Sequence, residues 1–424
     1  MKVLILCGAL SAVEAIDIYI VASVLPVLAR IYGVQPAAFA AVFVAQAIGQ
    51  TLGSCFGAPL ADRVGRRPVI LLSVVAFGVL TFAAAFATSL ALLVALRCLA
   101  LAFVGAAQPN LFALAGEFAA PANRHRFMLA IGSIHALGGG MAALISAWLL
   151  GLSWHAPLAL SAAVTLLLAA LAWRWLPESL AYLAARADAR PEPLRVLIRK
   201  MDASQSLEEI PAFCLEERPE RSATLRSLFT TGRRLSTGLL WLTTACSLPL
   251  LTTIGQWLPT FLHVYGGLEV RVAAAMTSLS GVSAALWPLA LMFAMDRLGV
   301  ARGLALNLFI GAVALLTFSA IGHWPAIGWF IGFAFGAFVA GSVTGVYALV
   351  AQSYPTQLRA TGLGWSMGAA RIVAILLPSM GGAALATGAS AGAVALSVAA
   401  PLSVAAVASL LLSSVSRART ASTQ

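Results

Sequence analysis

Long apolar runs, separated by short polar connections, repeat along nearly the whole chain of 424 residues. Each run is long enough to cross a lipid bilayer, for which an α-helix needs about 20 residues. Twelve such segments can be placed, and each of them predicts a transmembrane helix. The predicted spans are 3–28, 37–60, 68–87, 90–118, 127–150, 155–176, 235–263, 271–295, 303–321, 325–353, 361–386 and 390–414.

One long polar stretch, residues 177–234, interrupts this pattern between the sixth and seventh spans. We interpret it as a cytoplasmic linker between two six-helix halves, 1–176 and 235–414, rather than as a separate catalytic domain. A cytoplasmic tail is expected at 415–424. Within the linker, residues 194–200 (LRVLIRK) combine apolar and basic residues in a pattern typical of a short amphipathic helix on a membrane surface.

Arginines in the short connections indicate the orientation in the membrane. With the N-terminus inside, the cytoplasmic loops hold eight arginines and the outer loops hold two, as the positive-inside rule requires. Both termini are then expected in the cytoplasm. The cytoplasmic arginines are Arg63, Arg66, Arg67, Arg124, Arg126, Arg297, Arg302 and Arg359, and the outer ones are Arg30 and Arg271.

The composition excludes several other classes of protein. The chain is 61% hydrophobic and 10% charged, with a mean hydropathy of +0.95, which is far outside the range of soluble domains. The loop arginines explain the excess of 26 basic over 15 acidic residues, so we expect a lipid bilayer and no nucleic acid as partner. No histidine, cysteine or nucleophile has the spacing of a metal site or a catalytic motif, and we expect no cofactor and no enzyme.

The two halves share short motifs at nearly constant offsets. Residues 62–67 (DRVGRR) match residues 296–302 (DRLGVAR), 234 positions further on, since 296 minus 62 is 234. Leu25-Pro26 likewise matches Leu258-Pro259, at an offset of 233. Such repetition indicates a duplicated six-helix unit.

Residues 57–67 (GAPLADRVGRR) resemble the loop between the second and third helices of the major facilitator superfamily. Its charged side chains can bridge helix ends, and Gly65 allows a tight turn. The resemblance implies an all-α polytopic membrane protein with 12 transmembrane helices in two pseudo-symmetric halves, functional as a monomer. We expect gating contacts from Asp62, Arg63, Gly65, Arg66, Arg67, Glu117, Arg124, Asp296, Arg297 and Arg359.

Further motifs resemble the aromatic acid:proton symporter family, which carries benzoate-type, hydroxybenzoate, protocatechuate and related acids inward. The resemblance implies proton-coupled uptake of an aromatic carboxylate or related organic acid across the bacterial inner membrane, by alternating access. A proton-driven exporter of drugs or metabolites with the same fold is the alternative. The motifs are GAAQPN at 105–110, LPES at 176–179, WLPT at 257–260 and YPTQLRATGLGW at 354–365.

Three ionisable residues lie inside the apolar runs of the first half. Glu14 and Asp17 stand three residues apart, on one face of the first helix, where the family has Asp-Gly-x-Asp. Arg97 in the fourth span is expected at a similar depth to Asp17. Protonation of Asp17 would free Arg97 to bind a carboxylate, and deprotonation would release it, which couples the proton to the anion. The alternative is a structural ion pair that does not titrate.

His135 and Arg371 occupy nearly equivalent positions in the two halves. His135 is a candidate proton relay, with a histidine bonded inside the bundle as the alternative. Arg371 is a candidate second anchor for the anion, with a cap for helix carbonyls as the alternative. For the substrate ring and its hydroxyl groups we expect contacts from Trp257, Phe338, Tyr347, Gln108 and Asn110.

Overall fold

A computed structural model describes the chain except for residues 1, 120–123, 185–224, 230–232, 355 and 423–424. Within the described residues the chain is helical and contains no strand. The first six long helices are α1 (Lys2–Ile31), α2 (Ala40–Val64), α3 (Arg66–Ala85), α4 (Leu90–Glu117), α5 (Arg124–Leu149) and α6 (His155–Trp175). The last six are α10 (Arg234–Gly266), α11 (Val270–Leu298), α12 (Val300–Leu316), α13 (Ile327–Ser353), α14 (Thr356–Ala386) and α15 (Ala391–Ser422).

Four short elements accompany the long helices. The 3-10 turn η1 (Pro36–Phe39) precedes α2, and η4 (Thr317–Ala320) follows α12. Between the two sets of six lie α7 (Leu180–Ala184) and α9 (Leu225–Leu228). The amphipathic helix expected at 194–200 lies outside the described residues.

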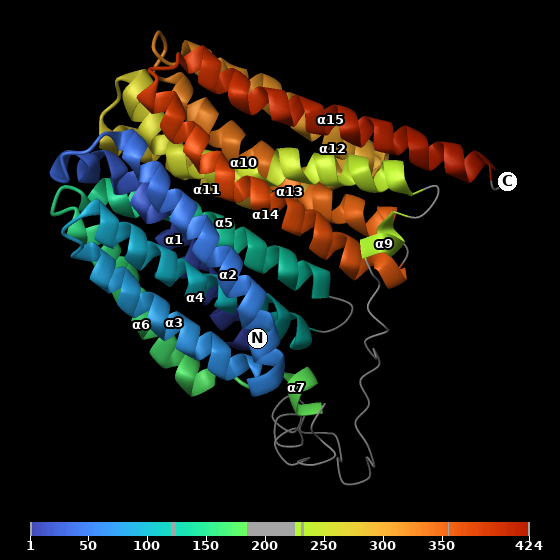
Figure 1. Cartoon of the computed structure of the whole chain (residues 1–424), viewed down its shortest axis with the longest axis horizontal. Helices are drawn as coiled ribbons and strands as arrows, with labels where there is room; N and C mark the ends of the chain where they lie inside the picture. The colour runs from blue at the N-terminus through green and yellow to red at the C-terminus, as the bar shows by residue number, and fades with distance from the viewer. Residues whose placement is uncertain (1, 120–123, 185–224, 230–232, 355, 423–424) are drawn as a thin grey trace.

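The long helices form two bundles that lie side by side, one from α1–α6 and one from α10–α15 (Figure 1). The bundles meet where α5 contacts α11, α2 contacts α14 and α1 contacts α10. A buried core cluster extends across this contact and includes Ile20 and Leu25 of α1 and Trp257 of α10. The elements α7 and α9 lie at one end of the molecule, called here the linker end (Figure 1).

The predicted membrane spans are confirmed. Eleven described helices are long and apolar enough to cross a membrane, and α10 supplies a twelfth as a bent pair, Arg234–Leu250 and Thr253–Gly266, at 41°. Pro249 stands at this bend, and a proline removes a backbone hydrogen bond from the helix. The helix α15 continues to Ser422, through most of the residues expected to form a cytoplasmic tail at 415–424, and the location of that tail in the cytoplasm stays a prediction. No proline or glycine follows Pro401 in this helix to end it.

The closest helix contact in the first bundle joins α2 to α4. A Cβ atom on Gly53 would collide with the backbone carbonyl of Ala102, and one on Gly105 would collide with the carbonyl of Gln50. Without a hydrophobic driving force inside the bilayer, such close backbone contact is a main source of helix association. These glycines therefore fix the position of α2 against α4.

We expect Gly53→Ala to lower the apparent melting temperature of the purified protein by several degrees. The added methyl group must push the two helices apart, and overpacking typically costs about 1–3 kcal/mol. Gly368→Ala in α14 is the matched control, since a Cβ there meets no atom within 4 Å and alanine favours the helix. Equal melting temperatures for the two variants would contradict this account of the α2–α4 contact.

Candidate functional site

Asp17 of α1 and Arg97 of α4 form an ion pair inside the first bundle, as the sequence predicted. The Nη1 atom of Arg97 lies 2.6 Å from Oδ2 of Asp17, and both side chains are completely buried. Charges at membrane depth cost several kcal/mol unless they are paired, roughly 2.5–3.5 each on insertion scales. The pair cancels both charges at once.

Other donors of Arg97 are also occupied. Nη1 donates to Oγ1 of Thr81 in α3 at 3.4 Å, and Nη2 donates to the backbone carbonyl of Asp17 at 3.0 Å. Nε and Nη2 each lie 3.0 Å from the side-chain amide of Gln46 in α2. A guanidinium only donates, so the amide oxygen must face it. Thr81, Gln46 and the backbone carbonyl of Asp17 thus accept hydrogen bonds from the guanidinium, and the carboxylate of Asp17 adds the ion pair.

Thr81 and Gln46 were not predicted from the sequence. A threonine or glutamine in an apolar helix usually bonds within its own helix or to a neighbour, and nothing in the spacing distinguishes these two. One signal was available: an arginine with five donors cannot be satisfied by a single carboxylate, so further acceptors had to lie on adjacent helices.

Glu14 and His135 lie outside this cluster. Glu14 is 1% exposed, and neither carboxylate oxygen has a hydrogen-bond partner among the described residues. Nδ1 of His135 in α5 lies 2.9 Å from the carbonyl and 3.1 Å from the hydroxyl of Ser11 in α1. His135 therefore joins α1 to α5, and its role as a proton relay stays a prediction.

Arg371 of α14 lies between the two bundles and is exposed. Its Nη1 donates to the hydroxyl of Ser54 in α2, so it connects the second half to the first. Tyr347 of α13, which is 49% exposed, lies within electrostatic range of the guanidinium. In contrast to Arg97, Arg371 is a cation that solvent and small molecules can reach.

Three other predicted substrate contacts are buried in helix interfaces in this conformation. Trp257 is fully buried and donates from Nε1 to the carbonyl of Pro378 at 3.1 Å. Phe338 packs edge-on against Trp287, with ring centroids 5.0 Å apart. The amide of Asn110 donates to the carbonyl of Ala106 at 2.8 Å. Their contact with a substrate stays a prediction.

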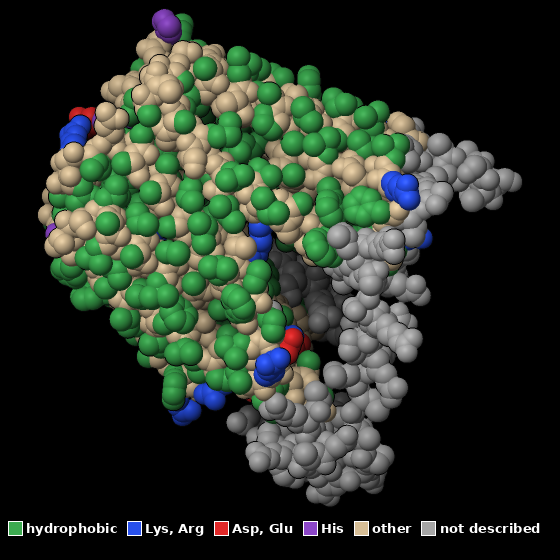
Figure 2. Space-filling model, viewed as in Figure 1, with side chains coloured by type: hydrophobic (Ala, Val, Ile, Leu, Met, Phe, Trp, Pro, Cys, Tyr) green, Lys and Arg blue, Asp and Glu red, His purple; other side chains and the backbone are tan. Residues whose placement is uncertain are grey.

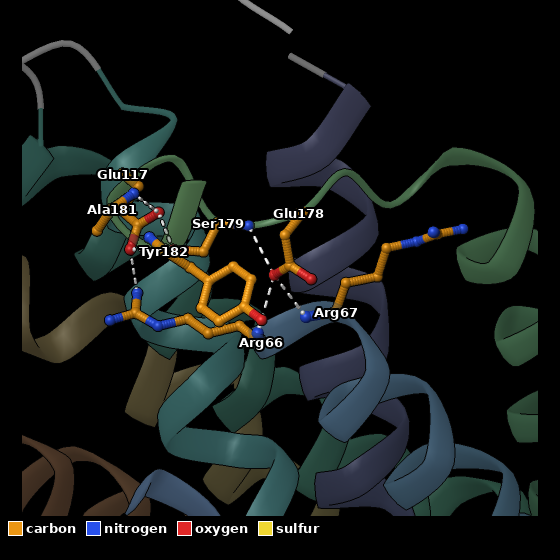
Figure 3. A network of polar contacts seen from close by, with 7 residues as sticks. All are labelled: Arg66, Arg67, Glu117, Glu178, Ser179, Ala181 and Tyr182. Carbon is orange, nitrogen blue, oxygen red and sulfur yellow. Dashed lines mark hydrogen bonds and ion pairs between the residues drawn. The ribbon is translucent and has the colours of Figure 1, made fainter. Parts of the chain in front are cut away.

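A network of polar contacts joins helix ends at the linker end (Figure 3). Arg66 forms an ion pair with Glu117 at the end of α4. Glu117 also accepts from the hydroxyl of Ser179 at 2.7 Å. Glu178 accepts from the backbone N–H groups of Arg66 and Arg67 at 2.8 and 3.0 Å and thereby caps α3. Glu178 and Ser179 belong to the LPES motif and were not predicted as gating residues.

Gly65 is the turn on which this network depends. Its φ of +103° is unfavourable for residues with a side chain. A Cβ atom at this position would also collide with the carboxylate of Glu178. The turn therefore places the first residues of α3 directly under the carboxylate that caps them.

Four other predicted gating residues lie at the ends of α2 and α11. The side chains of these four, Asp62, Arg63, Asp296 and Arg297, are exposed. Those of Arg124 and Arg359 lie outside the described residues. A hollow opens between the two bundles toward the linker end, with basic side chains visible at its edge (Figure 2).

The opposite end of the first bundle carries a separate cavity of about 470 Å³, lined by Tyr32, Phe86, Trp154 and His155 among others. Its polar groups are already used by the backbone. The hydroxyl of Tyr32 donates to the carbonyl of Ala87 at 2.9 Å, and burial raises the pKa of Tyr32. Nδ1 of His155 lies 2.5 Å from the carbonyl of Ala85. Arg371, exposed between the two bundles, offers an accessible cation, and its surroundings are the better candidate site.

Comparison with known proteins identifies a family and relatives for this chain. Residues 7–378 match the family model described as Major Facilitator Superfamily. A gallate transporter of Pseudomonas putida is 31% identical over 91% of this chain and 86% of its own length. The 4-hydroxybenzoate transporter PcaK of the same organism is 30% identical over 88% of this chain and 84% of its own length.

Solved structures of transporters share the fold. The xylose transporter XylE from E. coli, described as partially occluded and inward open, superposes with a TM-score of 0.72. It covers 97% of this chain and 95% of its own, at 15% identity. A D-xylose-proton symporter superposes with a TM-score of 0.67, over 96% of both chains at 14% identity. The relatives and structural neighbours are transporters and not enzymes.

We expect Thr81→Val to lower the apparent melting temperature more than Thr165→Val does. Thr81→Val leaves a donor of a buried cation without its acceptor, which costs about 1–3 kcal/mol. Thr165 is equally buried, but its hydroxyl only donates to the carbonyl of Ser161 in its own helix. A melting temperature of Thr81→Val at or above that of Thr165→Val would contradict the role of Thr81 in holding Arg97.

Proposed function

This chain belongs to the major facilitator superfamily of transporters, and we propose that it carries an aromatic carboxylate into the cell together with protons. The observation that carries the proposal is a pair of cations, one buried inside the first bundle and one exposed between the two bundles. Arg97 is sealed and neutralised by Asp17, whereas Arg371 is exposed. The transporters of gallate and 4-hydroxybenzoate among its relatives favour an aromatic acid as the substrate.

Arg371 is the first anchor for the substrate carboxylate. Its planar guanidinium can bind both oxygens of a carboxylate, and in the structure it contacts only the neutral hydroxyl of Ser54 among the described hydrogen bonds and ion pairs. Tyr347, which is 49% exposed and within electrostatic range of Arg371, is the candidate to pack against the ring of an acid held there. A substrate bound at this position contacts both bundles, because α2 and α14 belong to different halves.

The Asp17–Arg97 pair is the proton-sensitive element. While Asp17 is ionised, it neutralises Arg97, and Thr81, Gln46 and the backbone carbonyl of Asp17 hold the guanidinium in place. A proton on Asp17 removes the negative charge and leaves the buried cation uncompensated. The carboxylate of an acid that has bound at Arg371 can then supply the negative charge that compensates Arg97. Binding of the proton and of the acid is therefore favourable when both bind and unfavourable when only one binds. This is the thermodynamic condition for coupled transport.

Alternating access follows from movement of one bundle against the other around this site. The hollow at the linker end gives the substrate a path to one side of the membrane (Figure 2). Closure of that end requires the helix ends around Arg66, Glu117 and Glu178 to approach the second bundle. These residues therefore act as gating contacts that set the rate of transport and not the affinity of the site.

The loop arginines favour an orientation in which the linker end and both termini lie on the cytoplasmic side of a bacterial inner membrane. The transporter is proposed to act as a monomer, because a substrate path between its own two halves needs no second chain. Export of cationic drugs is the less favourable alternative, since a cation would meet the exposed guanidinium of Arg371.

We expect vesicles that contain the protein to accumulate radiolabelled 4-hydroxybenzoate or gallate when a pH gradient, acidic outside, is imposed. Arg371→Ala should weaken substrate binding at least tenfold, since a charge-assisted hydrogen bond contributes about 1.5–3 kcal/mol, and Arg371→Lys should restore part of the loss. Arg302→Ala, an exposed arginine at the start of α12, is the control and should bind normally. Uptake that ignores the pH gradient, or an unchanged affinity in Arg371→Ala, would contradict the proposal.

A further inference from the structure

One face of α2 carries three polar side chains at intervals of one helical turn: Gln46, Gln50 and Ser54. Gln46 accepts from Arg97, and Ser54 accepts from Arg371. This polar face therefore runs from the buried cation of the first bundle to the exposed cation of the second. Gln50 stands between them, one turn, or about 5.4 Å, from each neighbour.

Gln50 has one described partner, Gln108 of α4. Its Nε2 donates to Oε1 of Gln108 at 3.4 Å, which is long for a hydrogen bond. Among the described residues no other side-chain hydrogen bond involves either amide. The oxygen and one N–H of Gln50, and both N–H groups of Gln108, are therefore available. Both side chains are partly exposed, so a small molecule can reach them.

The backbone holds this amide pair in a fixed position. Gly105, one turn before Gln108, lies directly against the carbonyl of Gln50. Because α2 and α4 are in backbone contact here, the two amides are held together before any ligand arrives. Recognition by groups that are already in place loses little conformational entropy on binding.

We propose that Gln50 and Gln108 recognise a ring hydroxyl of the acid whose carboxylate Arg371 holds. This inference rests on the proposed function and specifies its substrate class as hydroxylated benzoic acids. The hydroxyl donates to Oε1 of Gln50, and Nε2 of Gln108 donates to the hydroxyl oxygen. Ser54 positions Arg371 one turn away, and about 5.4 Å is comparable to the span of a benzene ring between its carboxylate and a hydroxyl.

The physical basis of the selectivity is the loss of water from the amides. A hydroxylated ring replaces the displaced water with two hydrogen bonds, whereas an unsubstituted ring leaves the amides without partners. Gln50 and Gln108 thus act as specificity-determining residues. They contribute nothing to the binding of benzoate itself, which has no hydroxyl group.

The test is calorimetric titration of the purified full-length protein with benzoate, 4-hydroxybenzoate, 3,4-dihydroxybenzoate and gallate. Gln50→Met and Gln108→Met keep the length of the side chain and remove its amide. We expect each variant to bind at least one hydroxylated acid about tenfold more weakly, roughly one hydrogen bond, and to bind benzoate at least as tightly as the unaltered protein does, because methionine leaves no amide without a partner. Gln352→Met, at the exposed end of α13, should bind all four acids like the unaltered protein.

The double variant should lose more than either single variant, because each amide makes its own hydrogen bond to the hydroxyl, but less than the sum of the two losses, because the amides also hold each other in place. Benzoate also reports folding, since a misfolded variant would lose benzoate together with the other acids. An equal loss for benzoate, or no loss for any hydroxylated acid, would overturn this assignment and leave the proposed function intact. If the unaltered protein binds none of the four acids, the proposed function fails and the assignment fails with it.

Discussion

The charge of Arg97 is the constraint on which the first bundle depends. A guanidinium buried among transmembrane helices must be neutralised and must find an acceptor for each of its five N–H groups. Asp17, Thr81 and Gln46 supply acceptors from α1, α3 and α2. The side chain of Arg97 thereby joins α4 to α1, α2 and α3. A change in any partner of Arg97 therefore affects the contacts among all four helices.

The second feature of the fold is close contact between helices that carry little polar surface. Gly53 and Gly105 let α2 lie directly on α4, so the polar face of α2 is held in one position. That face connects the sealed pair at Arg97 with the accessible guanidinium of Arg371. At the linker end, Gly65 and Glu178 fix the start of α3 beside the end of α4. Rigid bundles with a polar contact between them suit movement of one half against the other.

Much of this architecture could be predicted from the sequence. The hydropathy pattern predicted the membrane spans, because a long apolar helix satisfies all of its backbone hydrogen-bonding groups within the lipid. The rise of a helix placed Asp17 and Arg97 at one depth, and the two side chains do form a pair. The LPES and DRVGRR motifs indicated the helix ends that Figure 3 brings together.

The rest depended on the rotation of each helix. A helix that is apolar on all sides has no periodicity that tells its inner face from its outer face. Trp257, which we expect to contact the substrate, packs in this conformation against Gly381 of α14 and Phe43 of α2, and nothing in the sequence indicated that packing. For the same reason Gln50 was not distinguished from the other polar residues of α2, and its place between two arginines appears only in three dimensions.

The central claim is that a proton on Asp17 accompanies the binding of an acid. Proton uptake by the purified protein in weakly buffered solution measures this directly, with a pH indicator and 4-hydroxybenzoate as ligand. The account predicts about one proton taken up per acid bound by linkage, and none in Asp17→Asn, which still binds the acid. Glu14→Gln should take up protons like the unaltered protein. Proton uptake that persists in Asp17→Asn, or that disappears in Glu14→Gln alone, would contradict the account.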